Sequence, residues 1–263
     1  KSKKVFFMRI IFGMKLLMLS LCLSSCGQPI CWIDEEPEML SCSELPLRPV
    51  RIALVLGSGG ARGMAHVGVL EELERAHIQI DLIVGCSAGS VIGALYADNP
   101  QAESIMAMTL HRKRHDFLEL CWWRCRYGFM HRGPFIDFIN TTLASKTFEE
   151  LKIPLVVVAT DLCKGEKVCF ASGPIAPTIH ASCAIPFCMC PVRYNGRILV
   201  DGGVIDPIPV SVAKLFNPDL IIAVDISSPL DGYDSPGHLF DIAKRSAEIS
   251  HQEHSRLCGL GAD

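Results

Sequence analysis

The chain has 263 residues, of which 49% are apolar, with 21 glycines and 16 prolines. A chain of this length can bury one large α/β core, and its composition excludes a disordered or fibrous protein. The formal charge is −3 at pH 7. Five basic residues and no acidic ones lie in the first 25 residues, so that 20 basic residues stand against 28 acidic ones in the rest. Such an acidic body excludes a typical nucleic-acid-binding protein.

The N-terminus predicts a targeting segment, a signal peptide over residues 1–25. Basic residues precede the apolar run Leu16 to Leu23, which is too short for a membrane span. The stretch Leu23-Ser24-Ser25-Cys26 resembles the lipobox of bacterial lipoproteins, in which the cysteine is acylated and becomes the mature N-terminus. This resemblance implies a protein anchored through Cys26 to a membrane of the bacterial cell envelope; an ordinary cleaved signal peptide or a wrongly assigned start is the alternative.

Residues 26–50 contain several prolines and acids and predict a tether to a catalytic domain over residues 51–263. In that domain short β-branched runs alternate with helical stretches, which predicts an α/β fold with a mostly parallel central sheet flanked by helices. We expect strands at 52–56, 80–84, 155–159, 167–171, 192–194, 198–200 and 220–224, and helices at 64–75, 88–97, 102–120 and 134–144. Asn195-Gly196 predicts a hairpin turn. A helical segment precedes residues 261–263, where a further strand would be natural, so we expect a truncated C-terminus.

The pentapeptide Gly85-Cys86-Ser87-Ala88-Gly89 lies between a predicted strand and a predicted helix. A serine on such a sharp turn has a strained backbone and a protruding hydroxyl, and glycines on both sides let the strand and helix approach closely. The pattern also arises by chance as an ordinary strand-to-helix turn. Its position favours Ser87 as a nucleophile, with Gly85 and Gly89 completing the nucleophile elbow.

A glycine-rich loop at residues 57–63 also lies between a strand and a helix. Its backbone amides suit an anion, either a phosphate or the oxyanion of an acyl-transfer intermediate. The dinucleotide motif GxGxxG fails because Arg62 stands at its last glycine, and the P-loop fails because GK[ST] is missing. An oxyanion hole is the better interpretation, formed by Gly59, Gly60 and Ala61, with Arg62 adding positive charge.

The tripeptide Asp201-Gly202-Gly203 directly follows the predicted strand at 198–200. Ligands collect at the carboxyl ends of strands in α/β sheets, and the two glycines leave room around the carboxylate. We expect Asp201 and Ser87 to project from the same edge of one sheet, with Asp201 as the base. A turn-forming Asp-Gly pair without a catalytic role is the alternative.

Together these motifs resemble the patatin-like phospholipase family over about residues 51–226. The glycine loop is similar to the family's G-G-G-x-[KR]-G oxyanion segment, although Ser58 stands where a glycine is usual. The other two motifs resemble its nucleophile elbow and its catalytic D-G-[GA]. Three further segments fit the bacterial branch: Ala159-Thr160-Asp161-Leu162, Ala181-Ser182-Cys183-Ala184-Ile185-Pro186 and Asp206-Pro207-Ile208-Pro209-Val210.

The resemblance implies an architecture related to the three-layer α/β-hydrolase fold and a lipid acyl hydrolase of phospholipase A or lysophospholipase type. Its substrates would be phospholipids or lysophospholipids at a membrane surface, cleaved through an acyl-enzyme on Ser87 with Asp201 as base and no cofactor or metal. A second class is a histidine-assisted esterase or acyltransferase, since His238, His251 and His254 follow in the order Ser, Asp, His. A third is a non-catalytic envelope lipoprotein.

Two further features complete the predictions. The 13 cysteines lack paired CxxC spacing, which favours buried or free thiols over a zinc site, and leaves open a pairing of Cys163 with Cys169 across a hairpin. Asp161 and His66 are expected to be structural. Residues 111–132 combine basic and aromatic side chains, which predicts a flap or membrane-facing patch, or else a solvated helix whose aromatics pack on the core.

Overall fold

The computed structural model describes residues 31–32, 49–110, 119–120, 128–131, 133–227, 230, 235 and 237–262. The predicted signal peptide and Cys26 lie outside these residues, as does most of the segment 111–132. Within the described part of the chain, no helix is both long and apolar enough to cross a bilayer. The predicted tether contains one described element, strand β1 (Cys31–Trp32), which pairs in parallel with β8.

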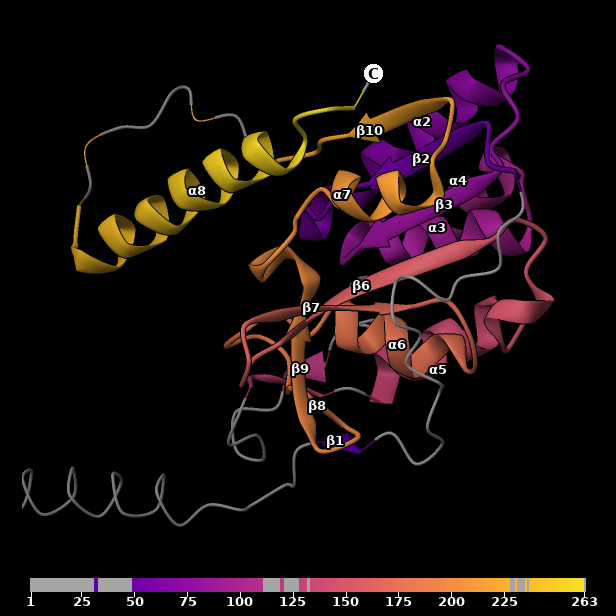
Figure 1. Ribbon diagram of the computed structural model, residues 1–263. Helices are drawn as coiled ribbons and strands as arrows, with labels where there is room; N and C mark the ends of the chain where they lie inside the picture. The colour runs from indigo at the N-terminus through magenta and orange to yellow at the C-terminus, as the bar shows by residue number, and fades with distance from the viewer. Residues whose placement is uncertain are drawn as a thin grey trace, which may run out of the picture.

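One large sheet forms the centre of the molecule, in the order β1-β8-β9-β6-β3-β2-β10, with β7 also paired to β6 (Figure 1). Its members besides β1 are β2 (Ile52–Leu56), β3 (Leu82–Cys86), β6 (Leu155–Asp161), β7 (Glu166–Phe170), β8 (Val192–Tyr194), β9 (Arg197–Asp201) and β10 (Leu220–Val224). Strands β10, β2, β3 and β6 are parallel, whereas β7 and β9 run antiparallel to β6. The predicted mostly parallel sheet is confirmed.

Strands β3 and β9 meet along the same side of β6. Residues 155–158 of β6 pair with β3, and residues 159–161 pair with β9. Strand β7 pairs with residues 157–161 and therefore occupies the other side of β6. Because β9 is antiparallel, its carboxyl end faces the carboxyl end of β3 across the step from Val158 to Ala159. The expectation of one common sheet edge is corrected accordingly: the two motifs converge at a junction inside the sheet.

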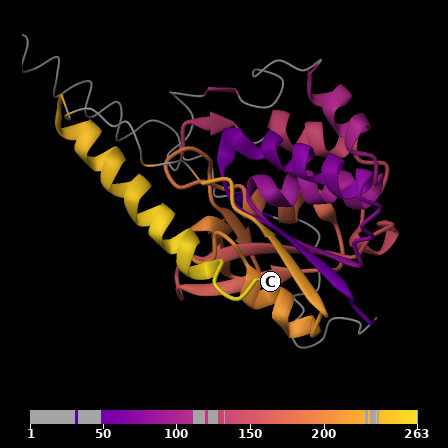
Figure 2. The same cartoon turned by 90° about the horizontal axis from the view of Figure 1, so that it is seen from above.

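Helices cover both faces of the sheet, as the α/β pattern predicted (Figures 1 and 2). They are α2 (Met64–Arg75), α3 (Ala88–Asp98), α4 (Ala102–Leu110), α5 (Gly133–Thr142), α6 (Ile175–Ser182), α7 (Val210–Ala213) and α8 (Leu239–Cys258). Because side chains alternate along a strand, Leu54 and Ile83 enter the core shared with α2, α3 and α6. Their neighbours Val55 and Val84 enter a smaller core shared with α7.

Helix α8 differs from the other helices because it projects away from the sheet instead of lying flat on it (Figures 1 and 2). Its C-terminal end is attached: Ser255 is 1% exposed and Cys258 packs against the smaller core. Toward the N-terminal end of α8, the side chains of Leu239, Ile242 and Ile249 are each about half exposed or more. The sequence indicated a helical segment near the C-terminus but not how this helix lies relative to the sheet.

Most predicted elements are confirmed within one or two residues, including the hairpin of β8 and β9, whose turn residues Asn195 and Gly196 have φ of 44° and 72°. The helix expected at 102–120 is too long. Helix α4 ends at Leu110, and Glu119–Leu120 forms strand β4, which pairs antiparallel with β5 (Met130–His131). Local periodicity could not show this pairing, because the partner strand lies ten residues farther along.

Candidate active site

Ser87 occupies the sharp turn between β3 and α3. Its φ of 52° and ψ of −120° lie in a region that non-glycine residues rarely adopt and that stores strain. The neighbouring Gly89 allows the turn to form, since a Cβ on it would lie 2.0 Å from the Leu56 carbonyl oxygen. A Cβ on Gly85 would lie 2.6 Å from the Ser90 Cα. The predicted nucleophile elbow is therefore formed by backbones in direct contact.

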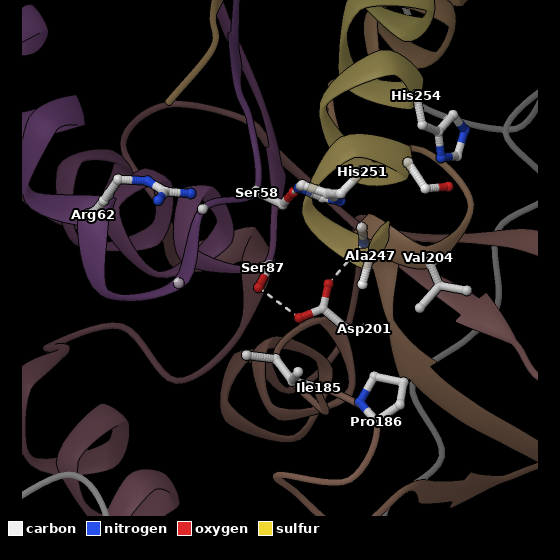
Figure 3. A pocket seen from close by; sticks show the side chains of 14 residues that line it. Ser58, Arg62, Ser87, Ile185, Pro186, Asp201, Val204, Ala247, His251 and His254 are labelled. Carbon is white, nitrogen blue, oxygen red and sulfur yellow. Dashed lines mark hydrogen bonds between the residues drawn. The ribbon is translucent and has the colours of Figure 1, made fainter. Parts of the chain in front are cut away.

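The Ser87 hydroxyl donates a hydrogen bond of 2.6 Å to Oδ2 of Asp201 (Figure 3). The other carboxylate oxygen, Oδ1, accepts a hydrogen bond of 2.7 Å from the Gly203 amide. Ser87 is 3% exposed and Asp201 is 5% exposed. The two side chains that the sequence singled out, 114 positions apart, are thus in contact in a largely dry environment.

Two hydroxyls from neighbouring elements hold this junction in place. Ser182, at the end of α6, accepts a hydrogen bond from the Ser87 amide (2.8 Å) and donates one to the Val158 carbonyl on β6 (2.6 Å). Thr160 donates to the Asp201 carbonyl (2.8 Å). Sequence reasoning quoted both residues in the family-like segments but gave neither a role. No local sequence feature indicated that Ser182 would be completely buried between the elbow and β6.

Burial raises the pKa of Asp201 to about 6. Hydrogen bonds from Ser87 and from the Gly203 amide act in the opposite direction but do not cancel this effect. A carboxylate with a raised pKa is a stronger base than an ordinary aspartate and stays mostly ionised at pH 7. Asp201 can therefore accept the proton of the hydroxyl that it contacts.

The glycine loop lies beside Ser87 and ends in a short 3-10 helix, Gly60–Gly63. Gly60 has a φ of 55°, which a glycine tolerates best. Within the described part of the chain, the amides of Gly59, Gly60 and Ala61 donate no hydrogen bond. Amides without an acceptor, next to the Ser87 hydroxyl, are available to an oxyanion.

His66, on α2, forms a hydrogen bond with the backbone of the glycine loop. It is completely buried, and its Nε2 lies 2.9 Å from the Gly57 carbonyl oxygen. Burial lowers the pKa of His66, so the neutral ring donates this hydrogen bond. The packing role expected for this histidine agrees with its position.

Arg62 and Ser58 connect the glycine loop to more distant segments. Nε of Arg62 donates to the Ile226 carbonyl oxygen at 2.7 Å. The Ser58 hydroxyl lies 3.3 Å from Nε2 of His251 on α8. Ser58, which stands where the family usually has glycine, thus contacts α8 through its hydroxyl, which a glycine could not do.

A pocket of about 520 Å³ opens at Ser87 and Asp201. The glycine loop forms one side, the segment around Ile185 and Pro186 another, and α8 a third (Figure 3). Helix α8 contributes Ala247, Ser250, His251 and His254. The sequence considered the two histidines only as bases and did not predict that this helix lines the pocket.

None of the three candidate histidines contacts Ser87 or Asp201 by a hydrogen bond in the described residues. His238 is the N-cap of α8, where its ring faces the Asp241 amide, and its side chain is 67% exposed. His251 faces Ser58. The serine-aspartate contact is therefore direct and has no imidazole between the two groups.

The remaining candidate residues, Asp161 and the cysteines, lie in surroundings that indicate a role in the fold. Asp161 is completely buried and accepts hydrogen bonds from the amides of Cys163 and Lys164 in the β6–β7 turn. Cys163 is exposed and Cys169 is buried, and no disulfide joins them across this hairpin. No group of three or more His, Cys, Asp or Glu side chains among the described residues is arranged to hold a metal ion.

The family model of patatin-like phospholipases matches residues 54–214. The chain belongs to the patatin-like phospholipase family. This match includes the glycine loop, the elbow and the Asp201 motif. The family resemblance of the sequence is therefore confirmed for the segment that forms the junction of β3, β6 and β9.

Curated relatives agree with this membership. An uncharacterized NTE family protein of Mycobacterium tuberculosis is 36% identical over 183 residues, which are 67% of this chain and 49% of that protein. Patatin-like phospholipase domain-containing protein 6 of Homo sapiens is 33% identical over 186 residues, 67% of this chain and 13% of that protein. A lysophospholipase of Pyricularia oryzae is 31% identical over 183 residues, 67% of this chain and 12% of that protein. The chain thus spans about half the length of these relatives or less.

Proposed function

We propose that the protein is a lipid acyl hydrolase of phospholipase A or lysophospholipase type, with a dyad of Ser87 and Asp201. The observation that supports this most is the hydrogen bond of 2.6 Å between the Ser87 hydroxyl and a buried carboxylate. Membership of the patatin-like phospholipase family supports the substrate class. The printed names of several relatives, among them a lysophospholipase, agree with it.

In the first step, Asp201 takes the proton of Ser87 as its oxygen attacks the ester carbonyl. The amides of Gly59, Gly60 and Ala61 then bind the negative oxygen of the tetrahedral intermediate. The alcohol leaves with a proton returned by Asp201, and an acyl-enzyme remains on Ser87. Water, activated by the same carboxylate, attacks the acyl-enzyme and releases the fatty acid.

The triad alternative has less support than the dyad. It requires an imidazole between the serine and the carboxylate, and the described histidines lie elsewhere. The non-catalytic lipoprotein has less support as well, because it leaves the strained backbone of Ser87 and the raised pKa of the neighbouring Asp201 unexplained.

Activity measurements on a panel of phospholipids, lysophospholipids and a soluble p-nitrophenyl ester test the proposal. Ser87→Ala and Asp201→Asn should each lower kcat by about 10³-fold or more, with unchanged circular dichroism. Wild type should react with a fluorophosphonate probe, and Ser87→Ala should not.

The histidine variants are the matched controls for the dyad. His238→Ala, His251→Ala and His254→Ala should each retain most turnover of the soluble ester. The dyad is contradicted if any one of them, still folded, abolishes turnover. A wild type without turnover and without probe labelling would favour the non-catalytic alternative.

The location in the bacterial cell envelope and the lipid anchor at Cys26 are also part of the proposal. They rest on the basic and apolar N-terminus and on the stretch ending at Cys26. An acyl anchor would hold the enzyme near a membrane surface that contains its substrate. Bacterial expression with labelled fatty acid should label the protein, and Cys26→Ser should abolish the label; release of unlabelled protein would refute the anchor.

A further inference from the structure

Exposed apolar side chains lie at the pocket that opens at Ser87. Ile185 and Val204 line this pocket and are 39% and 48% exposed. Figure 3 shows both of them around Asp201. Phe187 follows Ile185 by two positions and is 84% exposed. Apolar surface that stays in water adds nothing to the stability of the fold, so this group of side chains indicates contact with something outside the chain.

A second loop brings another phenylalanine next to Phe187. The Phe129 amide donates hydrogen bonds to the carbonyl oxygens of Phe187 (3.3 Å) and Cys188 (3.0 Å). The two backbones are in close contact here, since a Cβ on Gly128 would lie 2.7 Å from the carbonyl carbon of Met189. The side chain of Phe129 is 48% exposed. We call the four exposed side chains of this region the apolar rim: Phe129, Ile185, Phe187 and Val204.

The backbone of Phe187 makes its position in the rim unusual. Its φ of 67° lies in the left-handed region, which glycine and asparagine adopt far more readily than an aromatic residue. Hydrogen bonds from the amides of Cys188 (3.0 Å) and Met189 (2.9 Å) to the Ile185 carbonyl oxygen hold this turn. Neither the backbone nor burial therefore accounts for a phenylalanine at position 187. Strained residues of this kind are typical of functional sites.

The two segments that carry the aromatic side chains of the rim contain no charge. Residues 184–191 read Ala-Ile-Pro-Phe-Cys-Met-Cys-Pro, and residues 128–130 read Gly-Phe-Met. A charged group would have to lose its water before it entered hydrocarbon, and these segments are free of that cost. The rim therefore suits the apolar layer of a lipid surface, without a preference for anionic headgroups.

We propose that the apolar rim inserts into the surface of a lipid bilayer and holds the pocket against it. This proposal rests on the proposed acyl hydrolase function and adds the surface through which its site reaches lipid in an aggregate. A second copy of the chain, or another protein, bound to the rim would cover the pocket. A bilayer in the same place would instead supply the pocket with substrate.

Vesicle binding without turnover tests the rim. Full-length protein with Cys26→Ser and Ser87→Ala lacks the proposed anchor and the proposed nucleophile, and its affinity for phosphatidylcholine vesicles is measured by flotation. Adding Phe187→Asn or Phe129→Ala to this background should weaken binding about tenfold, because each removes a phenyl ring from contact with hydrocarbon. A rise in salt from about 0.1 M to about 0.5 M should change the binding of the background protein less than about twofold.

Leu215→Asn is the matched control for the loss of an exposed apolar side chain. Leu215 is 54% exposed and shortly precedes β10, at the amino end of the parallel strands, whereas Ser87 follows the carboxyl end of β3. This variant should bind vesicles like the background protein. An equal loss for Leu215→Asn and Phe187→Asn would overturn the rim as a specific surface.

The stability of Phe187→Asn distinguishes a surface role from a packing role. Asparagine tolerates a φ of 67° better than phenylalanine does, so the urea midpoint should stay the same or rise. A lower midpoint would show that the ring packs as part of the fold and would overturn its assignment to the lipid surface. A dimer that Phe187→Asn dissociates, measured by analytical ultracentrifugation, would assign the rim to a second copy instead.

Hydrolysis separates the rim from the proposed function. With Ser87 intact, Phe187→Asn should lower kcat/KM on vesicles about tenfold and on a soluble p-nitrophenyl ester less than about twofold. Unchanged vesicle binding by Phe187→Asn would overturn the rim even if the wild type hydrolyses lipids. Conversely, a wild type without turnover would refute the proposed function, while a tenfold loss of vesicle binding in Phe187→Asn would still support the rim.

Discussion

The junction of β3, β6 and β9 and the helix α8 both line the pocket at Ser87 and Asp201, but different forces position them. At the junction, backbones touch: positions 89 and 202 would each place a Cβ within 2.3 Å of a carbonyl oxygen. Helix α8 is attached through side chains, such as the Ser58–His251 contact and the packing of Cys258. Ser87 and Asp201 are thus fixed by close packing, whereas the part of the pocket formed by α8 depends on a few side-chain contacts.

Under the proposed function, this difference leads us to expect the chemistry at the junction and the selectivity at α8. A displacement of about 1 Å at Ser87 or Asp201 would break their hydrogen bond and with it the proton transfer that we propose for this pair. Side chains on α8 can change without disturbing the sheet, since the helix projects from it (Figure 2). We expect mutations at the junction to affect folding and turnover, and mutations on α8 to affect which lipid is cleaved.

The largest expected effect is that of Gly89→Ala. The added Cβ would lie 2.0 Å from the Leu56 carbonyl oxygen, and neither backbone can move away without disrupting the elbow. We expect a loss of more than about 3 kcal/mol in the free energy of unfolding, measured with urea.

Gly68→Ala is the control for this substitution. Gly68 is exposed on α2, where an added Cβ would meet no atom within 4 Å. The same chemical change should here raise the free energy of unfolding by about 0.5–1 kcal/mol. Similar stabilities for the two variants would contradict the close contact at the elbow.

A smaller effect is expected from the pKa of Asp201. The folded-state pKa is about 6, above the value of about 3.9 in an unfolded chain. The contribution of this group to stability is therefore complete below about pH 4 and is lost as the pH rises through 6. Asp201→Asn should raise the free energy of unfolding at pH 8 by about 1–3 kcal/mol, with no gain at pH 4.

The same pKa determines the pH dependence of turnover. Asp201 acts as a base only when it is ionised, so kcat/KM of wild type on a soluble ester should fall as the pH decreases through about 6. Thermal unfolding and a pH–rate profile measure the two effects. A profile without a transition near pH 6 would contradict Asp201 as the base.

The sequence predicted the junction well because its signals are local. Each motif combines a strand, a glycine-rich turn and a functional side chain within a few residues, so Ser87, Asp201 and the loop at 57–63 could be recognised without a structure. Their contact arises because β3 and β9 pair with adjacent stretches of β6. The head-to-head meeting of β3 and β9 was not predictable, since strand direction depends on tertiary pairing with β6.

The role of α8 was not predictable from the sequence for the opposite reason. His251 follows Ser58 by 193 positions, and no local pattern indicates which face of α8 meets the glycine loop. Ser182 is similar: a buried serine between β6 and the elbow has the same local sequence features as any serine at a helix end. Such contacts arise from the packing of elements and are visible only in three dimensions.

The smallest expected effect concerns the attachment of α8. Cys258 packs against the smaller core, and burial, with a further contribution from the Asp206 carboxylate, raises the pKa of its thiol to about 11. Cys258→Ala should remove part of this packing and lower the local opening free energy of α8 by about 1 kcal/mol, because the helix has few other buried contacts. Hydrogen exchange of the α8 amides should become about fivefold faster. The control is Cys163→Ala in the exposed β6–β7 turn, which should leave α8 exchange unchanged. Equally faster exchange in β3 and β6 would show that α8 opens only together with the sheet, and the two regions would then be one cooperative unit.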